Sequence, residues 1–260
     1  MGSVIEHDHV SPHDDGTRSE TMKAEIENPW GKMPRRAPFV LPEDEQFVAA
    51  FNAALGENFR DLHTIVRDVP PGAFAGPFDA PVILLLANPG LDPNDRIEQC
   101  TPTALDLIYE NLSSEVGSPG WVFDDHFTDM ACGRWWRTRT RDLSKELGGY
   151  DVLAERLLMI EFHGYHSKSW IAPFVTFPSQ YFGFQLVRQA MNRGALIILG
   201  RAMRYWYAAV PGLQDYENKI ERLASPRLVN LSVRNLGPDF GRVVAALNNV
   251  SWANPRHERS

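Results

Sequence analysis

Four short apolar runs carry the fold prediction. They span Val82 to Ala87, Leu157 to Phe162, Ala195 to Leu199 and Leu228 to Leu231. Each run is continuous rather than alternating, which is typical of strands that are buried on both faces of a parallel sheet. Longer segments with helical character separate the runs, and this alternation favours helices packed on both sides of the sheet. We therefore predict a three-layer α/β/α fold around a central, mainly parallel four-stranded sheet.

Apolar residues at three- and four-residue spacing predict the helices. Gly148 and Gly149 end one of them, and Gly194 ends another. Between Glu27 and Pro42, four prolines forbid a long helix, so this stretch is predicted to be an extended strap over the domain. The predicted helices cover residues 43–59, a segment near 104–112, and residues 135–147, 184–193 and 239–247.

Length and composition indicate one large domain. The chain has 260 residues, of which 43% are hydrophobic, enough for a packed core. No apolar run approaches the roughly 20 residues of a membrane-spanning helix, and the polar N-terminus lacks the apolar stretch of a secretory signal. We expect a cytoplasmic protein without a membrane partner. Cys100 and Cys132 give neither a disulfide framework nor metal-ligand spacing, and structural roles in a reducing compartment are expected for both.

The net charge of −7 argues against a nucleic-acid binder, because Lys and Arg supply most non-specific affinity for phosphates. Residues 1–20 hold five acids against Arg18, however, so that the remainder carries only −3. Four arginines within residues 134–141 lie beside Trp135 and Trp136, a mixture suited to phosphate contact and base stacking. A solvated helix face with two core tryptophans is the alternative explanation.

Polar side chains follow the predicted strands where the carboxyl edge of an open α/β sheet gathers functional groups. The first strand ends in Asn88-Pro89-Gly90, and the third in Gly200-Arg201. The second is followed by residues 161–167 (EFHGYHS), and the last by residues 230–235 (NLSVRN). A structural junction between strand and loop does not need so many polar groups, so we predict a polar cleft at this edge.

Two of these strand ends, in this order, resemble motifs of the uracil-DNA glycosylase superfamily. Asn88-Pro89-Gly90 is similar to the first motif of its thymine- and mismatch-type branch, and Asn230-Leu231-Ser232 resembles its final motif, although the His-Pro-Ser of the best-known members is absent. The resemblance covers roughly residues 80–247. It implies an enzyme that flips a pyrimidine nucleotide out of double-stranded DNA and hydrolyses its N-glycosidic bond, leaving an abasic site. It implies no metal and no organic cofactor.

The resemblance also assigns catalytic roles. Asn88 would hold the attacking water, because an oxocarbenium-like sugar requires orientation of the water more than a strong base. Asn230 would contact the base carbonyl and favour departure of the anionic leaving group. Trp135, in the cluster Arg134-Trp135-Trp136, would stack on the base. Its distance from Asn88 indicates an insertion near residues 95–125, from which Phe123 or Phe127 could supply the stacking ring instead.

Contacts with the duplex are assigned to the last motif and to the arginine-rich segment. Ser232 and nearby backbone amides, together with Asn235, would bind phosphates, and Arg137 would contact DNA. Arg234, or Leu236 just beyond it, would fill the gap left in the base stack. A structural alternative is that Asn235 caps the final helix.

Glu161 departs from the family pattern, which places an Asn at this position to read the pyrimidine edge. An ionised Glu only accepts hydrogen bonds and would suit the exocyclic amine of cytosine better than uracil. Tyr165 and His166 would add polar tips that reach substituents on the base or the DNA backbone. Alternatively, Glu161 forms a salt bridge with Arg201, and His166 is a structural histidine.

The favoured substrate is therefore a modified cytosine, and some branches of the superfamily serve in defence by destroying phage genomes that contain hypermodified cytosine. Uracil repair is the first alternative. A hydrolase of free nucleosides or nucleotides and a non-catalytic DNA-binding module are the others. We expect a monomer, with an acidic flexible tail over residues 1–26 and a single domain over residues 27–260.

Overall fold

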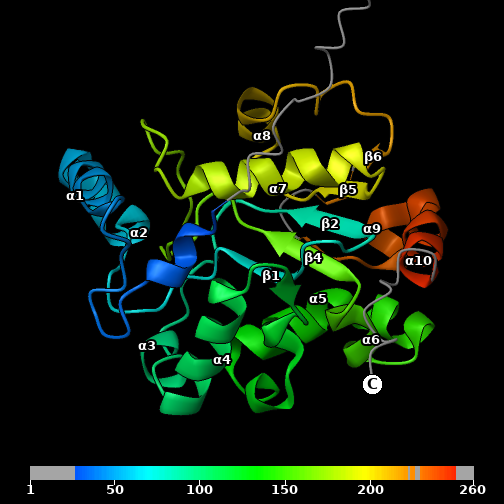
Figure 1. Cartoon of the computed structure of the whole chain (residues 1–260), viewed down its shortest axis with the longest axis horizontal. Coiled ribbons are helices and arrows are strands. Elements are labelled where there is room, and N and C mark those ends of the chain that lie inside the picture. Colours follow the sequence, from blue (N-terminus) through cyan, green and yellow to red (C-terminus); the bar gives the residue numbers. More distant parts are fainter. Residues whose placement is uncertain (1–26, 222, 226–228, 250–260) are drawn as a thin grey trace, which may run out of the picture.

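The computed structural model describes residues 27–221, 223–225 and 229–249 (Figure 1). The predicted acidic tail, residues 1–26, lies outside this part of the chain. The described residues form a mixed sheet of six strands with helices on both sides, which confirms the predicted α/β class. None of the described helices has the length and apolar character needed to cross a bilayer.

Four neighbouring strands of the sheet run parallel, and two further strands extend it in antiparallel fashion. In spatial order the strands are β3 (Gly117–Ser118), β1 (Phe74–Pro77), β4 (Leu157–Ile160), β2 (Val82–Leu85), β5 (Leu196–Leu199) and β6 (Lys219–Ile220). The parallel group is β4, β2, β5 and β6. The three strands β4, β2 and β5, at the centre of the whole sheet, are fully buried runs, as predicted for strands covered on both faces.

The register makes the three central strands end at the same level. Leu85 of β2 is paired with Ile160 of β4 on one side and with Leu199 of β5 on the other. The ladder continues one step further, because the Leu86 N–H donates to Ile160 O at 2.9 Å and the Gly200 N–H donates to Leu85 O at 2.9 Å. The chain segments that follow these strands therefore leave the sheet from one common edge.

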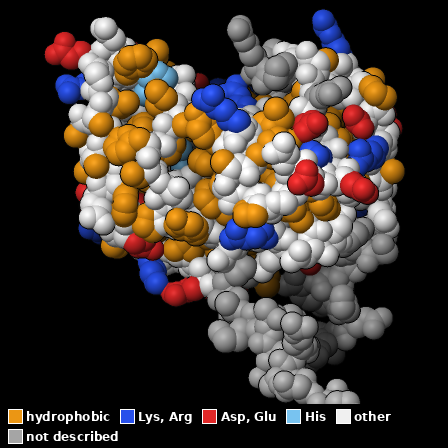
Figure 2. Space-filling view, turned by 90° about the horizontal axis from the view of Figure 1, so that it is seen from above, with side chains coloured by type: hydrophobic (Ala, Val, Ile, Leu, Met, Phe, Trp, Pro, Cys, Tyr) orange, Lys and Arg blue, Asp and Glu red, His pale blue; other side chains and the backbone are white. Residues whose placement is uncertain are grey.

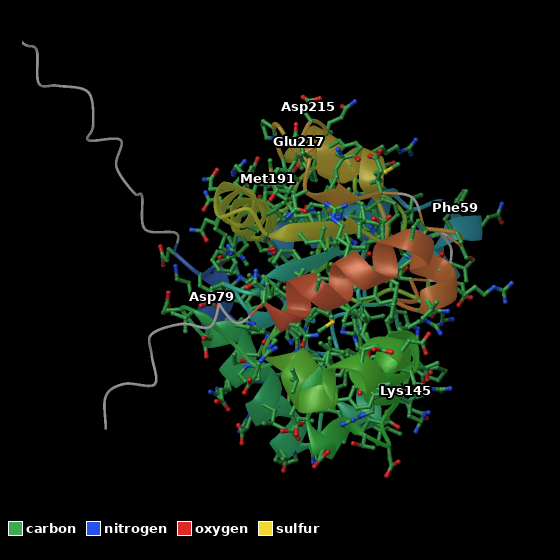
Figure 3. The ribbon with its side chains drawn as sticks, turned by 90° about the vertical axis from the view of Figure 1, so that its right-hand side faces the viewer. Phe59, Asp79, Lys145, Met191, Asp215 and Glu217 are labelled. Atoms are coloured by element: carbon green, nitrogen blue, oxygen red, sulfur yellow. The ribbon has the colours of Figure 1, made fainter. Side chains whose placement is uncertain are left out.

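Helices form a layer on each side of this sheet. On one side lie α7 (Gln180–Asn192) and α8 (Met203–Ala209), and on the other α4 (Pro102–Ser113), α5 (Ala131–Leu147) and α6 (Tyr150–Ala154). Figure 3 shows this separation: Met191 of α7 lies on one side of the sheet and Lys145 of α5 on the other. α10 (Phe240–Asn248) packs against α5 and β2. The carboxyl edge of β2 and β4 points toward α1, α2 and α3 (Figure 1).

The remaining elements have at most ten residues each, and α3 and η2 contribute residues to the carboxyl edge. They are η1 (Pro29–Lys32), α1 (Glu45–Ala54), α2 (Glu57–His63), α3 (Asp95–Glu98), η2 (Trp121–Phe123), η3 (Asp125–Phe127), α9 (Val233–Leu236) and η4 (Gly237–Asp239). Phe59 and Leu62 of α2 and Phe174 are exposed. Hydrophobic side chains also gather on that part of the surface in Figure 2.

Local signals explain where the long helices begin and end. Thr101 caps α4 by accepting a hydrogen bond from the Ala104 N–H, and Pro102 occupies its first position. α5 ends at Leu147 and is capped by Gly148, whose φ of +86° is the left-handed conformation that favours glycine. The helices predicted from periodicity near 104–112 and at 135–147 are confirmed, and each extends further than predicted.

The predicted helix over residues 43–59 is split in two. α1 ends at Ala54, and α2 begins at Glu57 after Gly56, whose backbone is extended (φ −61°, ψ 155°). The apolar periodicity continues across the break, so it does not reveal that Gly56 leaves the helix.

The fourth predicted strand is wrong in its described part. Leu228 lies outside the described residues, and Val229, Asn230 and Leu231 form no strand. The Leu231 N–H instead donates to Arg139 O at 2.8 Å, so this buried segment is tied to α5 rather than to the sheet. The fourth parallel strand is β6, which has too few residues to give an apolar run. The antiparallel β1 was also missed, because its Gly76 and Pro77 are typical of turns.

The segment predicted as an insertion, residues 95–125, contains regular structure. It includes α3, α4, β3 and η2, and it leads through η3 into α5. Gly133 in the first turn of α5 lies so close to η3 that a Cβ there would collide with the carbonyl oxygen of Phe127. The position of η3 against α5 thus depends on a glycine.

Replacing Gly133 by Ala should therefore destabilise the protein. We expect the free energy of unfolding to fall by about 1–3 kcal/mol, the usual cost of overpacking, because η3 must move away from α5. Urea denaturation followed by circular dichroism measures this change. Gly241→Ala in α10 is the matched control, since nothing lies within 4 Å of the added methyl group. Equal stability of the two variants would contradict the close packing.

Candidate functional site

A cavity of about 500 Å³ lies at the carboxyl edge of the sheet. The segments that follow three parallel strands contribute to its wall: Asn88, Pro89 and Gly90 after β2, Glu161 after β4, and Arg201 after β5. α3 and the first turns of α5 contribute the opposite part. The predicted polar cleft is therefore present at the predicted edge of the sheet.

Asn88 is held in a fixed orientation within this wall. Its Nδ2 donates to the Oγ of Ser167 at 3.1 Å and to the backbone O of Ser167 at 3.3 Å. Ser167 in turn donates from its Oγ to Ser169 O at 3.0 Å. Because both bonds use the amide nitrogen, Oδ1 of Asn88 is left as the acceptor for a cavity ligand. Asn88 thus lies at the predicted cleft, and its water-positioning role stays a prediction.

His166 supports the turn that follows Asn88. Its Nδ1 lies 2.6 Å from Gly90 O, and its Nε2 lies 3.0 Å from Pro70 O. Gly90 has a φ of +72°, a conformation that favours glycine, and His166 holds the carbonyl of that residue. The imidazole borders the cavity, but both of its nitrogens contact backbone carbonyls. The geometry thus assigns it a structural role, in place of the predicted contact with a base.

Glu161 places a buried carboxyl group at the cavity. Its backbone N–H donates to Ala73 O at 3.0 Å, which fixes the residue at the end of β4. Its Oε2 is buried and has no hydrogen-bond partner among the described residues. Burial raises the pKa of this carboxyl well above its ordinary value, and the positive charge of Arg201 partly opposes the shift. Burial therefore favours the protonated form of Glu161, in the opposite direction from the ionised carboxylate that the sequence analysis expected.

Tryptophans form much of the remaining wall. Trp135 of α5 is 39% exposed, its ring meets that of Trp136 edge-on with centroids 4.8 Å apart, and the guanidinium of Arg139 lies 4.9 Å from its ring centroid. Trp121 and Trp170 also line the cavity, and the Nε1 of each is buried without a partner among the described residues. These are large flat surfaces with polar edges, suited to a planar ligand.

Of the predicted stacking residues, Trp135 alone lines the cavity. Phe123 and Phe127 are buried in the core, where Phe127 packs against Trp121 and Phe123 against Tyr150. The insertion does supply an aromatic ring to the wall, but through Trp121.

Tyr165 does not reach the cavity, contrary to the prediction. Its side chain is buried, and its OH donates to Asp44 Oδ2 at 2.6 Å and accepts a hydrogen bond from the Leu41 N–H at 3.2 Å. The two bonds anchor the end of the predicted strap, at Leu41, and Asp44 just beyond it to the loop after β4. The polar tip of Tyr165 is used in holding the scaffold together.

Arg137 is likewise structural, which corrects its assignment to DNA binding. Its side chain is only 17% exposed. The guanidinium donates to Phe123 O at 2.6 Å and lies 4.6 Å from the ring centroid of Tyr150, so it ties η2 to α5. Phosphate contact would require these interactions to break.

The last predicted motif divides into buried and exposed residues. Asn235 is buried; it accepts a hydrogen bond from the Ser225 N–H at 2.6 Å and donates to Asn230 O at 2.9 Å, so its side chain is engaged inside the protein and not free for the predicted phosphate contact. It also does not cap the final helix, whose N-cap residue is Asp239. Leu236 is buried and cannot act as a wedge. Ser232 caps α9 by accepting from the Asn235 N–H. Arg234 is exposed, and Val233 beside it, which the sequence analysis did not single out, is also exposed.

Asn230 is absent from the cavity wall, although its Oδ1 is buried and has no partner among the described residues. The segment lies beside the end of β5, because a Cβ on Gly200 would be 2.9 Å from Cγ1 of Val229. The predicted convergence of Asn88, Glu161 and Asn230 therefore holds for the first two residues. Arg201 occupies the wall on the β5 side.

Several wall residues were not proposed as site residues. Arg201 directly follows the third predicted strand, so the same rule that selected Asn88 and Glu161 could have selected it. Trp136 was noted only as the neighbour of Trp135. Trp121, Asp95 and Gln99 gave no comparable signal, because their positions depend on how α3 and η2 pack over the sheet edge, and Trp170 lies in the long loop between β4 and α7. Within the described residues, no group of three His, Cys, Asp or Glu side chains could hold a metal ion.

No family model, curated protein or solved structure matches this chain. The geometry of the cavity and the motif resemblance are therefore the basis for assigning a function.

The raised pKa of Glu161 can be tested through stability. Its folded-state pKa lies above the unfolded value of about 4.3, so unfolding releases a proton and the wild type loses stability as pH rises above that value. Glu161→Gln removes this loss. We expect the variant to gain stability relative to wild type as pH rises from about 4.3 to the folded-state pKa, by up to about 1.4 kcal/mol per pH unit.

Urea denaturation at several pH values measures this difference. Glu110→Gln on the exposed surface of α4 is the control and should show no comparable trend. A difference between Glu161→Gln and wild type that does not change with pH would show that Glu161 is ionised in the folded protein.

Proposed function

We propose that this protein is a DNA glycosylase that binds a flipped-out pyrimidine nucleotide and hydrolyses the bond between its base and deoxyribose. One observation carries this proposal: Asn88, Glu161 and Trp135 lie on the wall of a single cavity at the carboxyl edge of the sheet. These residues were selected from sequence motifs that are far apart in the chain. Their convergence supports a pocket for a planar, hydrogen-bonding ligand.

Each of the three residues has a role in this reaction. The ring of Trp135 offers a face on which the base stacks, an interaction worth about 1–3 kcal/mol per base. Glu161 pairs with the edge of the base. Asn88, oriented by Ser167, uses its Oδ1 to position the water that attacks the sugar once the glycosidic bond has weakened. The reaction leaves an abasic site in the DNA.

A protonated Glu161, the form that burial favours, changes the expected selectivity. With cytosine, its carbonyl oxygen would accept from the exocyclic amine and its O–H would donate to N3. With uracil, the O–H would donate to O4 and the carbonyl oxygen would accept from N3–H. Hydrogen bonding at Glu161 thus permits both bases, and uracil is a second candidate substrate.

The polar part of the cavity wall favours a substituted base. The volume of about 500 Å³ does not by itself select one, because the sixteen heavy atoms of a pyrimidine and its deoxyribose take up to about 480 Å³ at about 30 Å³ each. The wall continues, however, to Asp95 of α3 and to Gln99 just after it. A cytosine carrying a polar substituent could form hydrogen bonds there, and excision of such bases from phage DNA would be a defence activity. We place the enzyme in the cytoplasm as a monomer.

DNA would approach the cavity mouth over exposed parts of α5 and α9. Arg139 lies over the Trp135 ring, and its Nε is buried without a partner among the described residues. Arg234 and the exposed Val233 on α9 would fill the space that the flipped nucleotide leaves in the base stack. This pair replaces Leu236 as the wedge.

Incubating the purified protein with DNA duplexes tests the proposal. The duplexes should carry cytosine, cytosine with a bulky polar C5 substituent, or uracil at one position, and abasic sites are detected as alkali-labile breaks. We expect the wild type to produce breaks at the substituted cytosine. In Asn88→Ala the rate of break formation should fall to about one hundredth of the wild-type rate or less, because the water loses its orientation.

Asn192→Ala is the matched control, since Asn192 is exposed at the end of α7 near the opposite edge of the sheet. It should retain full activity. Release of bases from free nucleosides but not from duplexes would instead support a nucleoside hydrolase. Binding of the duplexes without any breaks would support a non-catalytic module.

A further inference from the structure

Departure of cytosine demands more of the site than departure of uracil. When the C1′–N1 bond breaks, its electron pair moves onto the base, and the anion of an amino-pyrimidine is a poorer leaving group than that of uracil. Asn230, the residue predicted to stabilise this charge, does not line the cavity. A different group on the wall must therefore meet the departing base.

We propose, on the basis of the proposed function, that Glu161 is a catalytic general acid that donates its carboxyl proton to ring N3 of the cytosine as the glycosidic bond breaks. This goes beyond pairing with the base, because a pairing residue keeps its proton. Glu161 lines the cavity, and the Oε2 of its carboxyl group is buried without a hydrogen-bond partner among the described residues, so none of these residues competes with a ligand for it.

The surroundings of Glu161 suit both stages of a proton transfer. Before the transfer, burial favours the protonated carboxyl, which is the form that a general acid needs. After the transfer, the carboxylate lies near the positive charge of Arg201, which stabilises it. Glu161 is also fixed by the backbone bond from its N–H to Ala73 at the end of a buried strand, which limits its movement away from the base.

The two histidines that follow β4 are poor sources of this proton. Burial lowers the pKa of His163 to about 3, so it carries no proton to donate near neutral pH, and His163 is not among the residues that line the cavity. Both nitrogens of His166 contact the carbonyl oxygens of Gly90 and Pro70, and Asp95 of α3 supplies the charge that faces this ring.

The other titratable groups of the wall are engaged or hold their protons tightly. Asp95 accepts hydrogen bonds from the Asp92 N–H at 2.6 Å and from Gln99 at 2.8 Å. Lys168 is paired with Asp61 at 2.7 Å. Burial raises the pKa of the Cys132 thiol to about 12. Among the described wall residues, Glu161 therefore combines a transferable proton with an unpartnered oxygen.

The proposed step conserves atoms and charge. The C1′–N1 electron pair goes to the base while the Glu161 proton goes to N3, so the base leaves as a neutral molecule. The water held by Asn88 adds to the oxocarbenium carbon C1′ and loses one proton to solvent. Glu161 then takes one proton from solvent. The net reaction is hydrolysis of the N-glycosidic bond.

Glu161→Gln separates proton donation from base recognition. The amide keeps one hydrogen-bond acceptor and one donor in nearly the same shape, but it has no acidic proton to transfer. Under single-turnover conditions with a duplex carrying substituted cytosine, we expect the rate of base release to fall by about 100-fold or more. The Kd for the same duplex should change by less than about threefold. A duplex carrying 5-fluorouracil, whose anion departs more easily, should show a much smaller loss of rate.

The pH profile gives a second measurement that does not depend on this variant. The wild-type rate should fall as pH rises through the pKa of Glu161. Arg201→Gln removes the charge that opposes the raised pKa, so this fall should move to higher pH. A profile that is the same in Arg201→Gln and wild type would argue against Glu161 as the proton donor.

The outcomes distinguish the two proposals. If wild type releases base and Glu161→Gln does so at the same rate, the general-acid role is overturned and the glycosylase assignment stands. If Glu161→Gln loses rate equally on substituted cytosine and 5-fluorouracil, and its Kd rises in parallel, Glu161 is a binding residue and the acid role is again overturned. If wild type releases no base from any duplex, both proposals fall.

Discussion

The common end point of three parallel strands is the constraint on which the site depends. Leu85 is in register with Ile160 and Leu199, so the next residues along each strand emerge at one edge. A shift of one residue in either pairing would turn the following side chains to the opposite face of the sheet. The apolar packing of β2, β4 and β5 between two helical layers therefore fixes the functional side chains indirectly. Asn88, Glu161 and Arg201 meet because buried leucines and isoleucines hold the register.

The buried carboxyl of Glu161 lowers the stability of the folded protein, whereas the apolar side chains of the core raise it. A buried carboxyl with an unpartnered oxygen carries a desolvation penalty that a Leu or Gln at the same position would reduce. The surrounding strands tolerate this cost because they are fully buried and bonded on both sides. An unfavourable group on a rigid element is the arrangement expected where a protein trades stability for binding or catalysis. Ala202 with its φ of +54°, directly after Arg201, is a second unfavourable feature at the same edge.

The sequence revealed those parts of the fold and site that depend on local patterns. Continuous apolar runs identified β2, β4 and β5, and the rule that polar groups follow strand ends located Asn88 and Glu161. The errors have a shared cause. The run ending at Leu231 is apolar because it is buried against α5, and burial alone does not require a strand. β1 and β6 are short strands whose pairing is decided by neighbours distant in the chain. Likewise, the position of Trp121 depends on the tertiary packing of η2, which no local pattern encodes.

Polar residues near a site are divided between holding the scaffold and meeting a ligand, and their hydrogen bonds decide the division. Tyr165, Arg137 and Asn235 were each predicted from the sequence to be functional. In the structure, Tyr165 hydrogen-bonds to Asp44, and Arg137 and Asn235 hydrogen-bond to backbone groups inside the protein. The amide nitrogen of Asn88 also donates to protein groups, whereas its oxygen is not used in these bonds. The Oε2 of Glu161 has no hydrogen-bond partner among the described residues. Unused acceptors and donors at a cavity are thus a sharper criterion than residue type. By that criterion Asn88 and Glu161 are the polar wall residues that can meet a ligand, and Trp135 adds an aromatic ring beside them. The proposed excision of a base that is both stacked and hydrogen-bonded requires both kinds of surface.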